Sequence, residues 1–159
     1  MRTGRLQRLA STALVVLSSS AAVAETAVYR NDRFGTTLSY PADVFSQPME
    51  PPANGDGMTW LSADGASLSA HASYNALMLT PRAFADQAGR GNGHFEVTYR
   101  RVADRWVVLS GFEDGDIFYY RFEFGADDVI HSMLLRYPAA LRERYDPLTG
   151  AIGRSLDGP

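Results

Sequence analysis

The chain has 159 residues, of which 21% are charged, and its formal net charge is −3 with histidine neutral. It contains no cysteine, which excludes disulfides, thiol catalysis and thiolate metal ligands from this chain. The excess of acidic residues argues against partners that carry many negative charges, such as nucleic acid or an anionic lipid surface.

Residues 1–24 have the three parts of a secretory signal peptide. The first part is positively charged, with Arg2, Arg5 and Arg8 and no acidic residue. A short apolar run, Leu9–Leu17, follows, and Ala22-Val23-Ala24 then forms a small-residue cleavage motif. An uncleaved anchor and a buried N-terminal helix are the other interpretations. The apolar run is shorter than the roughly 20 residues that a membrane-spanning helix needs.

Cleavage between Ala24 and Glu25 would release residues 25–159 as one domain. We therefore expect a periplasmic or secreted bacterial protein that is not inserted in a membrane after cleavage. Because residues 1–24 contain three basic and no acidic residues, cleavage would change the net charge from −3 to −6.

Apolar–polar alternation and turn signals predict a series of β-strands in the rest of the sequence. The loop Ala42–Gly57 is rich in proline and glycine and is expected to contain no strand. Asp64-Gly65 predicts a tight hairpin, and the short connections after residue 94 predict an antiparallel meander. The predicted strands are residues 27–31, 36–40, 58–62, 66–74, 94–102, 105–110, 117–124 and 129–137.

Two helical regions are predicted. Thr80-Pro81 favours a helix start with Thr80 as N-cap, and the glycines after residue 88 end that helix. A second apolar stripe with helical spacing lies near the C-terminus. Pro147 interrupts this stripe, so two short helices are expected, with Asp146 as the N-cap of the second. The stripe consists of Leu141, Tyr145, Leu148, Ile152 and Leu156.

One predicted strand carries a row of hydroxyls with a histidine: Ser67, Ser69, His71 and Ser73 share one face. Such a face could bind a polar ligand or support Ser–His hydrolysis. Neighbours on the same face are about 6.5–7 Å apart, which is too far for the direct hydrogen bond that activates a serine. A plain polar strand face is the alternative. His131 alternates with apolar residues and is expected at the edge of the core.

The turn "GFEDGD" brings together Glu113, Asp114 and Asp116. Three nearby carboxylates could hold a metal ion, or could act as acid and base if their surroundings separated their pKa values. A solvated turn explains the same composition, because such residues are typical of turns. We expect no metal or other cofactor, and these three remain candidates only.

The sequence from Val28 to Leu156 resembles small exported bacterial proteins of the PsbP-like fold. The resemblance rests on the early "FGTTLSYP", the hairpin "MTWLSADGASLSAHA", the meander "VTYRRVADRWVVLSGFEDGDIFYY" and the closing "YPAALRERYDPLTGAIGRSL". The fold is shared by an extrinsic subunit of photosystem II and a Ran-binding nucleotide-release factor. At the position where relatives usually end in Ser-Phe, this chain has Leu156.

The resemblance implies an α+β fold, in which a central antiparallel sheet of about seven strands has helices on both faces. Known members are mostly non-enzymatic and dock on larger assemblies, and none of their functional residues matches a position here. We therefore expect a non-catalytic binding or docking module of the cell envelope, whose partner is another envelope protein or a small ligand. A small hydrolase that uses the His71 strand face is the alternative.

Overall fold

A computed structural model describes residues 25–91 and 93–159. The predicted signal peptide, including Ala24, lies outside the described residues, and Glu25 directly precedes the first strand. The strands are β1 (Thr26–Arg30), β2 (Thr37–Pro41), β3 (Gln47–Pro48), β4 (Gly57–Leu61), β5 (Ser67–Tyr74), β6 (Phe95–Val102), β7 (Trp106–Glu113), β8 (Asp116–Phe124) and β9 (Val129–Pro138). The helices are α1 (Pro81–Ala88), the 3₁₀-helix η1 (Ala139–Leu141) and α2 (Arg142–Arg154).

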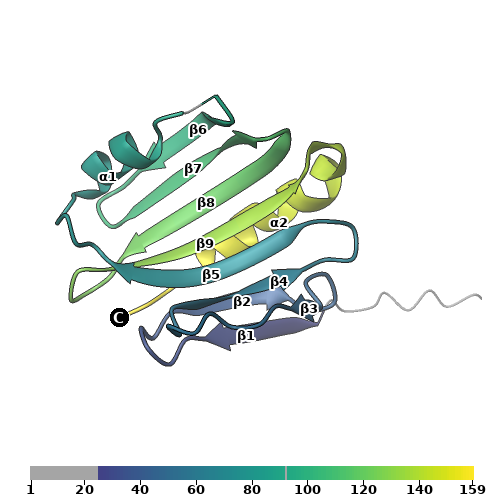
Figure 1. The fold of residues 1–159 in the computed structure, drawn as a ribbon, viewed down its shortest axis with the longest axis horizontal. Coiled ribbons are helices and arrows are strands. Elements are labelled where there is room, and N and C mark those ends of the chain that lie inside the picture. The colour runs from purple at the N-terminus through teal and green to yellow at the C-terminus, as the bar shows by residue number, and fades with distance from the viewer. Residues whose placement is uncertain (1–24, 92) are drawn as a thin grey trace, which may run out of the picture.

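The main sheet has seven antiparallel strands in the order β3-β4-β5-β9-β8-β7-β6 (Figure 1). The meander β6–β9 and the β4–β5 hairpin are confirmed, and Gly65 in the hairpin turn has the positive φ of +94° that the turn requires. β5 pairs with β9 along its whole length, from Ser67 opposite Arg136 to Tyr74 opposite Val129. This long-range pairing joins the hairpin to the meander.

β1 and β2 form a separate antiparallel pair outside the main sheet. One expectation about the strands was wrong. The loop Ala42–Gly57, expected to contain no strand, includes the short strand β3 at the edge of the sheet. Pro48 has no N–H to donate, and an edge strand is where a sheet tolerates such a residue.

Each face of the main sheet carries a helix, which confirms the α/β/α arrangement: α1 lies on the near face in Figure 1 and α2 lies behind the sheet. On the α2 side, Tyr145 and Ile152 pack against Leu68, Met133 and Leu135, all almost fully buried. The β1–β2 pair extends this layer.

On the α1 side, the aromatic residues of β8 form the floor on which the helix packs. Phe84 makes edge contacts with Phe122 and Phe124, with ring centroids 4.7 and 5.6 Å apart. Thr80 caps α1, because its Oγ1 accepts a hydrogen bond from the Ala83 N–H at 3.3 Å. The predicted start of this helix is confirmed.

The expected break at Pro147 was wrong, because α2 is one helix that contains Pro147. Tyr145 and Ile152 lie on either side of the proline and are 0% and 2% exposed. Packing of both against the sheet holds one continuous helix despite the backbone hydrogen bond that proline cannot donate. Asp146 does not cap a helix and instead accepts a hydrogen bond from the Tyr137 hydroxyl at 2.5 Å.

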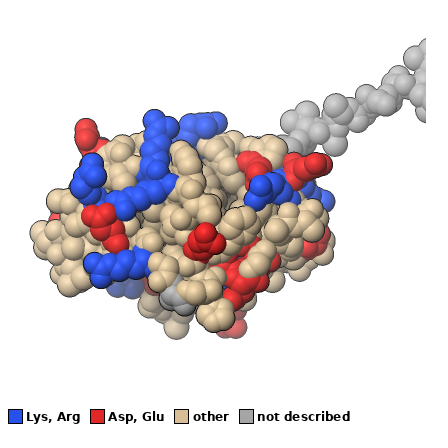
Figure 2. Space-filling view, turned by 90° about the horizontal axis from the view of Figure 1, so that it is seen from above, with Lys and Arg blue, Asp and Glu red and all other residues tan. Residues whose placement is uncertain are grey.

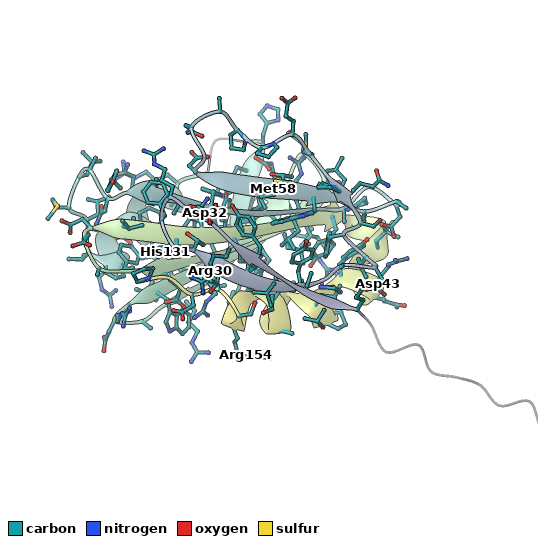
Figure 3. All side chains as sticks on the ribbon, turned by 90° about the horizontal axis from the view of Figure 1, so that it is seen from below. Arg30, Asp32, Asp43, Met58, His131 and Arg154 are labelled. Carbon is teal, nitrogen blue, oxygen red and sulfur yellow. The ribbon has the colours of Figure 1, made fainter. Side chains whose placement is uncertain are left out.

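Residues 157–159 cross back over β2 and β9. Thr37 and Asp157 exchange two backbone hydrogen bonds of 2.8 and 3.1 Å, and the Ala126 N–H donates to the Pro159 carbonyl at 2.7 Å. This strap covers His131, which is 1% exposed and lies within the body of the molecule (Figure 3). No helix in the described part of the chain is long and apolar enough to span a membrane.

Candidate functional site

The row of Ser67, Ser69 and His71 lies on the α1 side of the sheet, as the alternation in β5 predicts. Between them Leu68 and Ala70 point into the core on the α2 side. His71 and Ser69 line a shallow pocket of about 230 Å³, together with Pro52, Asp56, Gly57, Met58, Thr59, Tyr120 and Leu134.

The His71 pocket does not pair histidine with a serine. Ser69 Oγ is hydrogen-bonded to Thr59 Oγ1 at 2.8 Å, and within the described residues no hydrogen bond reaches the His71 ring. Burial lowers the pKa of His71, and the charge of Asp56 only partly opposes this. His71 is therefore a neutral side chain beside an already paired hydroxyl, an arrangement that binds more readily than it activates a nucleophile.

The three carboxylates of the acidic turn do not converge on one point. Glu113 and Asp116 both bind the guanidinium of Arg136, at 3.0 and 3.1 Å, whereas Asp114 turns away to His94 at 2.8 Å. Among residues 25–91 and 93–159, no three His, Asp or Glu side chains are grouped closely enough to hold a metal ion.

A larger groove lies on the opposite side of the sheet, between α2 and strands β6–β8. We call it the α2 groove. Its volume is about 320 Å³, which falls within the range of small-ligand sites. It is lined by Thr98, Tyr99, Ser110, Gly111, Phe112, Ile117, Tyr119, Tyr137, Arg142, Asp146 and Thr149.

Glycine shapes both walls of the α2 groove. On the helix wall, a Cβ at Gly153 would lie 3.1 Å from the Tyr119 ring, so the helix backbone sits directly against β8. On the strand wall, β6 has a bulge between Val97 and Tyr99. The backbone next to the bulge packs closely against Gly111, where a Cβ would lie only 1.8 Å from the Glu96 carbonyl oxygen. Larger residues at these positions would push the walls apart.

The polar groups inside the α2 groove are mainly hydroxyls. Burial raises the pKa of Tyr119 and of Tyr137, so both phenols are neutral at physiological pH. Ser110 donates to the Phe118 carbonyl at 2.7 Å and Tyr137 donates to Asp146. The Tyr99 hydroxyl forms no hydrogen bond to a described residue, and this side chain is 52% exposed.

Arginines surround the α2 groove. Arg142 lines it, with its guanidinium carbon 5.9 Å from the centre of the Phe112 ring. Arg101 and Arg121 lie over the Trp106 ring at 5.3 and 4.6 Å. Figure 2, which looks onto the β6 edge of the sheet, shows arginine side chains there together with acidic ones.

The charge of these arginines is only partly balanced. Arg121 forms an ion pair with Glu123. Arg101, Arg142 and Arg154 form no ion pair with any described residue. Arg154 extends outward from the end of α2 (Figure 3) and lies close enough to Tyr119 to act against the rise in its pKa.

The α2 groove was not among the sites predicted from the sequence. The period of two that places Tyr99 with Arg101 and Tyr119 with Arg121 on one face is visible in the sequence. What the sequence does not reveal is that α2 lies over only part of that face. The groove contains hydrogen-bond donors, a cation and the Tyr137–Asp146 pair, but no histidine and no serine bound to a base, so its geometry suits binding.

Comparison with known proteins gives information on the fold. No protein-family model matches the chain, and no curated protein matches it significantly. The solution structure of cyanobacterial PsbP (CyanoP) from Synechocystis sp. PCC 6803 is similar, with a TM-score of 0.63 at 10% sequence identity. The match covers 91% of this chain and 99% of that one. The chain therefore has a PsbP-like fold.

Proposed function

We propose that this protein is an exported, non-catalytic binding module of the cell envelope that holds a small ligand in the α2 groove. The observation that carries the proposal is the groove itself, where α2, β6, β7 and β8 bring together hydroxyls and a guanidinium. Export rests on the signal-peptide pattern of residues 1–24. The PsbP-like fold is compatible with a non-catalytic role, because known members of that fold are mostly non-enzymatic.

The first test concerns export. Expression of the full chain in a Gram-negative host, followed by osmotic release of the periplasm, should give a protein whose intact mass begins at Glu25. A full-length chain retained in the membrane fraction would contradict the export part of the proposal.

The second test concerns the α2 groove. Native mass spectrometry of the protein purified from the periplasm should show a bound small molecule of defined mass. Thr149→Trp places a large ring in the groove and should remove the mass of the bound molecule. Ala151→Trp is the control: it adds the same ring at an exposed position on α2 outside the groove, and the bound mass should remain. A ligand that survives Thr149→Trp would exclude the α2 groove as its site.

A hydrolase centred on His71 has less support, because Ser69 is paired with Thr59. It would be recognised by ester hydrolysis that His71→Gln abolishes and Thr149→Trp leaves unchanged. Hydrolysis that persists in His71→Gln would remove this alternative.

A further inference from the structure

We infer that the ligand of the α2 groove carries an anionic group, a carboxylate or a phosphate, and that Arg142 is its principal partner. This inference rests on the proposed binding function and adds the chemical class of the ligand. Three features of the groove support it: an arginine without an acidic partner among the described residues, neutral hydroxyl donors, and an excess of positive charge around the rim.

Arg142 is exposed, lines the α2 groove and forms no ion pair with a described residue. The nearest carboxylate on the same wall is Asp146, one turn along α2, and it accepts the hydrogen bond of the Tyr137 hydroxyl. The Arg142 guanidinium stands beside the Phe112 ring, whose face attracts the cation and limits its positions. A planar guanidinium of this kind offers two parallel donors to a carboxylate or a phosphate.

The hydroxyls of the α2 groove complement this cation. Tyr99 of β6 and Tyr119 of β8 lie on either side of Ser110 of β7, because both align with it across the sheet. A neutral phenol donates one hydrogen bond, and a negatively charged acceptor strengthens such a bond. The phenols and Arg142 therefore place hydrogen-bond donors and a cation along the same groove.

The rim of the α2 groove is more basic than the protein as a whole. Arg101 and Arg154 lie beyond the row of tyrosines without an acidic partner among the described residues, while the whole chain has a net charge of −3. A local excess of positive charge on an acidic protein attracts anions to that place and repels them elsewhere.

The size of the α2 groove limits the ligand. About 320 Å³ suits a small molecule and is at the lower end of ligand pockets. The exposed part of Phe112 gives an apolar surface next to the arginine, which fits a small organic anion better than a bare inorganic ion.

The experiment is a titration of the ¹⁵N-labelled protein, residues 25–159, followed by amide chemical shifts. Sodium phosphate and sodium acetate are added in separate series, and sodium chloride keeps the ionic strength constant. Both Arg142→Gln and Arg144→Gln are titrated in the same way. Arg144 is the matched control: it lies two residues further on the same helix, has the same charge and pairs with Asp64 at 3.2 Å outside the groove.

We expect shifts at Tyr99, Phe112, Tyr119 and Thr149 with at least one of the two anions. Arg142→Gln should weaken the binding about 10-fold or more, the effect of losing a charge-assisted hydrogen bond, and Arg144→Gln should leave it unchanged. Shifts with phosphate alone would assign a phosphate ester, and shifts with acetate would assign a carboxylate. No groove shifts with either anion, or equal shifts in Arg142→Gln, would overturn the inference.

The two proposals fail separately. If the ligand found by mass spectrometry is lost in Thr149→Trp but retained in Arg142→Gln, the groove binds a neutral molecule and only the anion inference is wrong. If neither the wild-type protein nor any variant carries a ligand, and neither anion changes the amide chemical shifts of the groove residues, then both the binding function and the anion inference are wrong.

Discussion

Thr36 and His131 are joined by a hydrogen bond of 2.8 Å between Thr36 Oγ1 and His131 Nδ1, although 95 residues separate them. Thr36 directly precedes β2 and His131 is part of β9, so this bond connects the N-terminal strand pair with the main sheet. Thr36 is 0% exposed, and neither side chain can exchange its partner for water.

Thr36→Val should lower the free energy of unfolding by about 1–3 kcal/mol. Valine keeps the shape of threonine but leaves His131 Nδ1 buried without a partner, which costs the desolvation of that atom. Urea denaturation measures the change. Thr149→Val, at the partly exposed face of α2, removes a hydroxyl from a solvent-accessible hydrogen bond and should cost much less. Equal losses in the two variants would contradict the role given to the Thr36–His131 bond.

The stability of the protein should fall as the pH decreases below about 6.5. Burial lowers the pKa of His131 below the usual 6.5, and the Pro159 backbone, Asp157 and Glu123 oppose this only in part. Between the folded pKa and 6.5 the unfolded chain binds a proton that the folded protein does not, so acid favours unfolding. The stability contribution is fully present above 6.5 and is lost below it.

Melting temperatures measured between pH 7.5 and 5.5 should follow this slope. His131→Asn keeps a hydrogen-bonding group near Thr36 but cannot titrate, and it should flatten the slope. Burial also lowers the pKa of His71, so His71 should cause the part of the slope that remains in His131→Asn. The further substitution His71→Gln should remove that part. A slope that is unchanged in the double variant would show that other groups cause it.

Gly111→Ala should destabilise the protein by about 1–3 kcal/mol or more, the usual cost of overpacking. The new Cβ would overlap the Glu96 carbonyl in the bulge of β6, and backbone cannot move aside as a flexible side chain can. Gly55→Ala is a useful comparison, because nothing lies within 4 Å of a Cβ there, although its φ of +65° adds some strain. Denaturant midpoints of the two variants measure the difference, and a larger loss in Gly55→Ala would be contrary to expectation.

Pro147→Ala should stabilise α2. Proline in a helix interior costs up to about 3 kcal/mol relative to alanine, and this proline is exposed, so little packing is lost with it. The melting temperature should rise while binding in the α2 groove is unchanged. A decrease would indicate that the proline ring positions the first turn of α2 against the sheet.

Much of the fold follows from local signals. Asp64-Gly65 marks the β4–β5 hairpin, Thr80-Pro81 marks the start of α1, and the alternating aromatics of β8 mark its core face. These signals succeed because each depends on residues adjacent in the sequence. The continuous helix through Pro147 and the separate β1–β2 pair depend on tertiary packing, which local propensity does not describe.

The candidate site likewise combines features that are visible in the sequence with features that depend on tertiary packing. The sequence identifies Tyr99, Arg101, Tyr119 and Arg121 as strand residues, but only the position of α2 makes a groove of them. Conversely, several residues that stood out in the sequence are already engaged in the structure: Glu113 and Asp116 bind Arg136, and Ser69 binds Thr59. The stretches rich in acidic residues, serine or glycine proved to be turns and strand faces. The groove is lined by residues that belong to no sequence motif.

The backbone pairing of Thr37 with Asp157 also affects when this protein can fold. β2 pairs with β1 early but also bonds to a residue 120 positions later, and β5 pairs with β4 early but also with the distant β9. A chain still emerging from the ribosome therefore lacks one neighbour for each of these two strands. Such distant pairings make folding slow. For the export that we propose, this delay would be an advantage, because the translocation machinery would meet the chain before its last residues complete the structure.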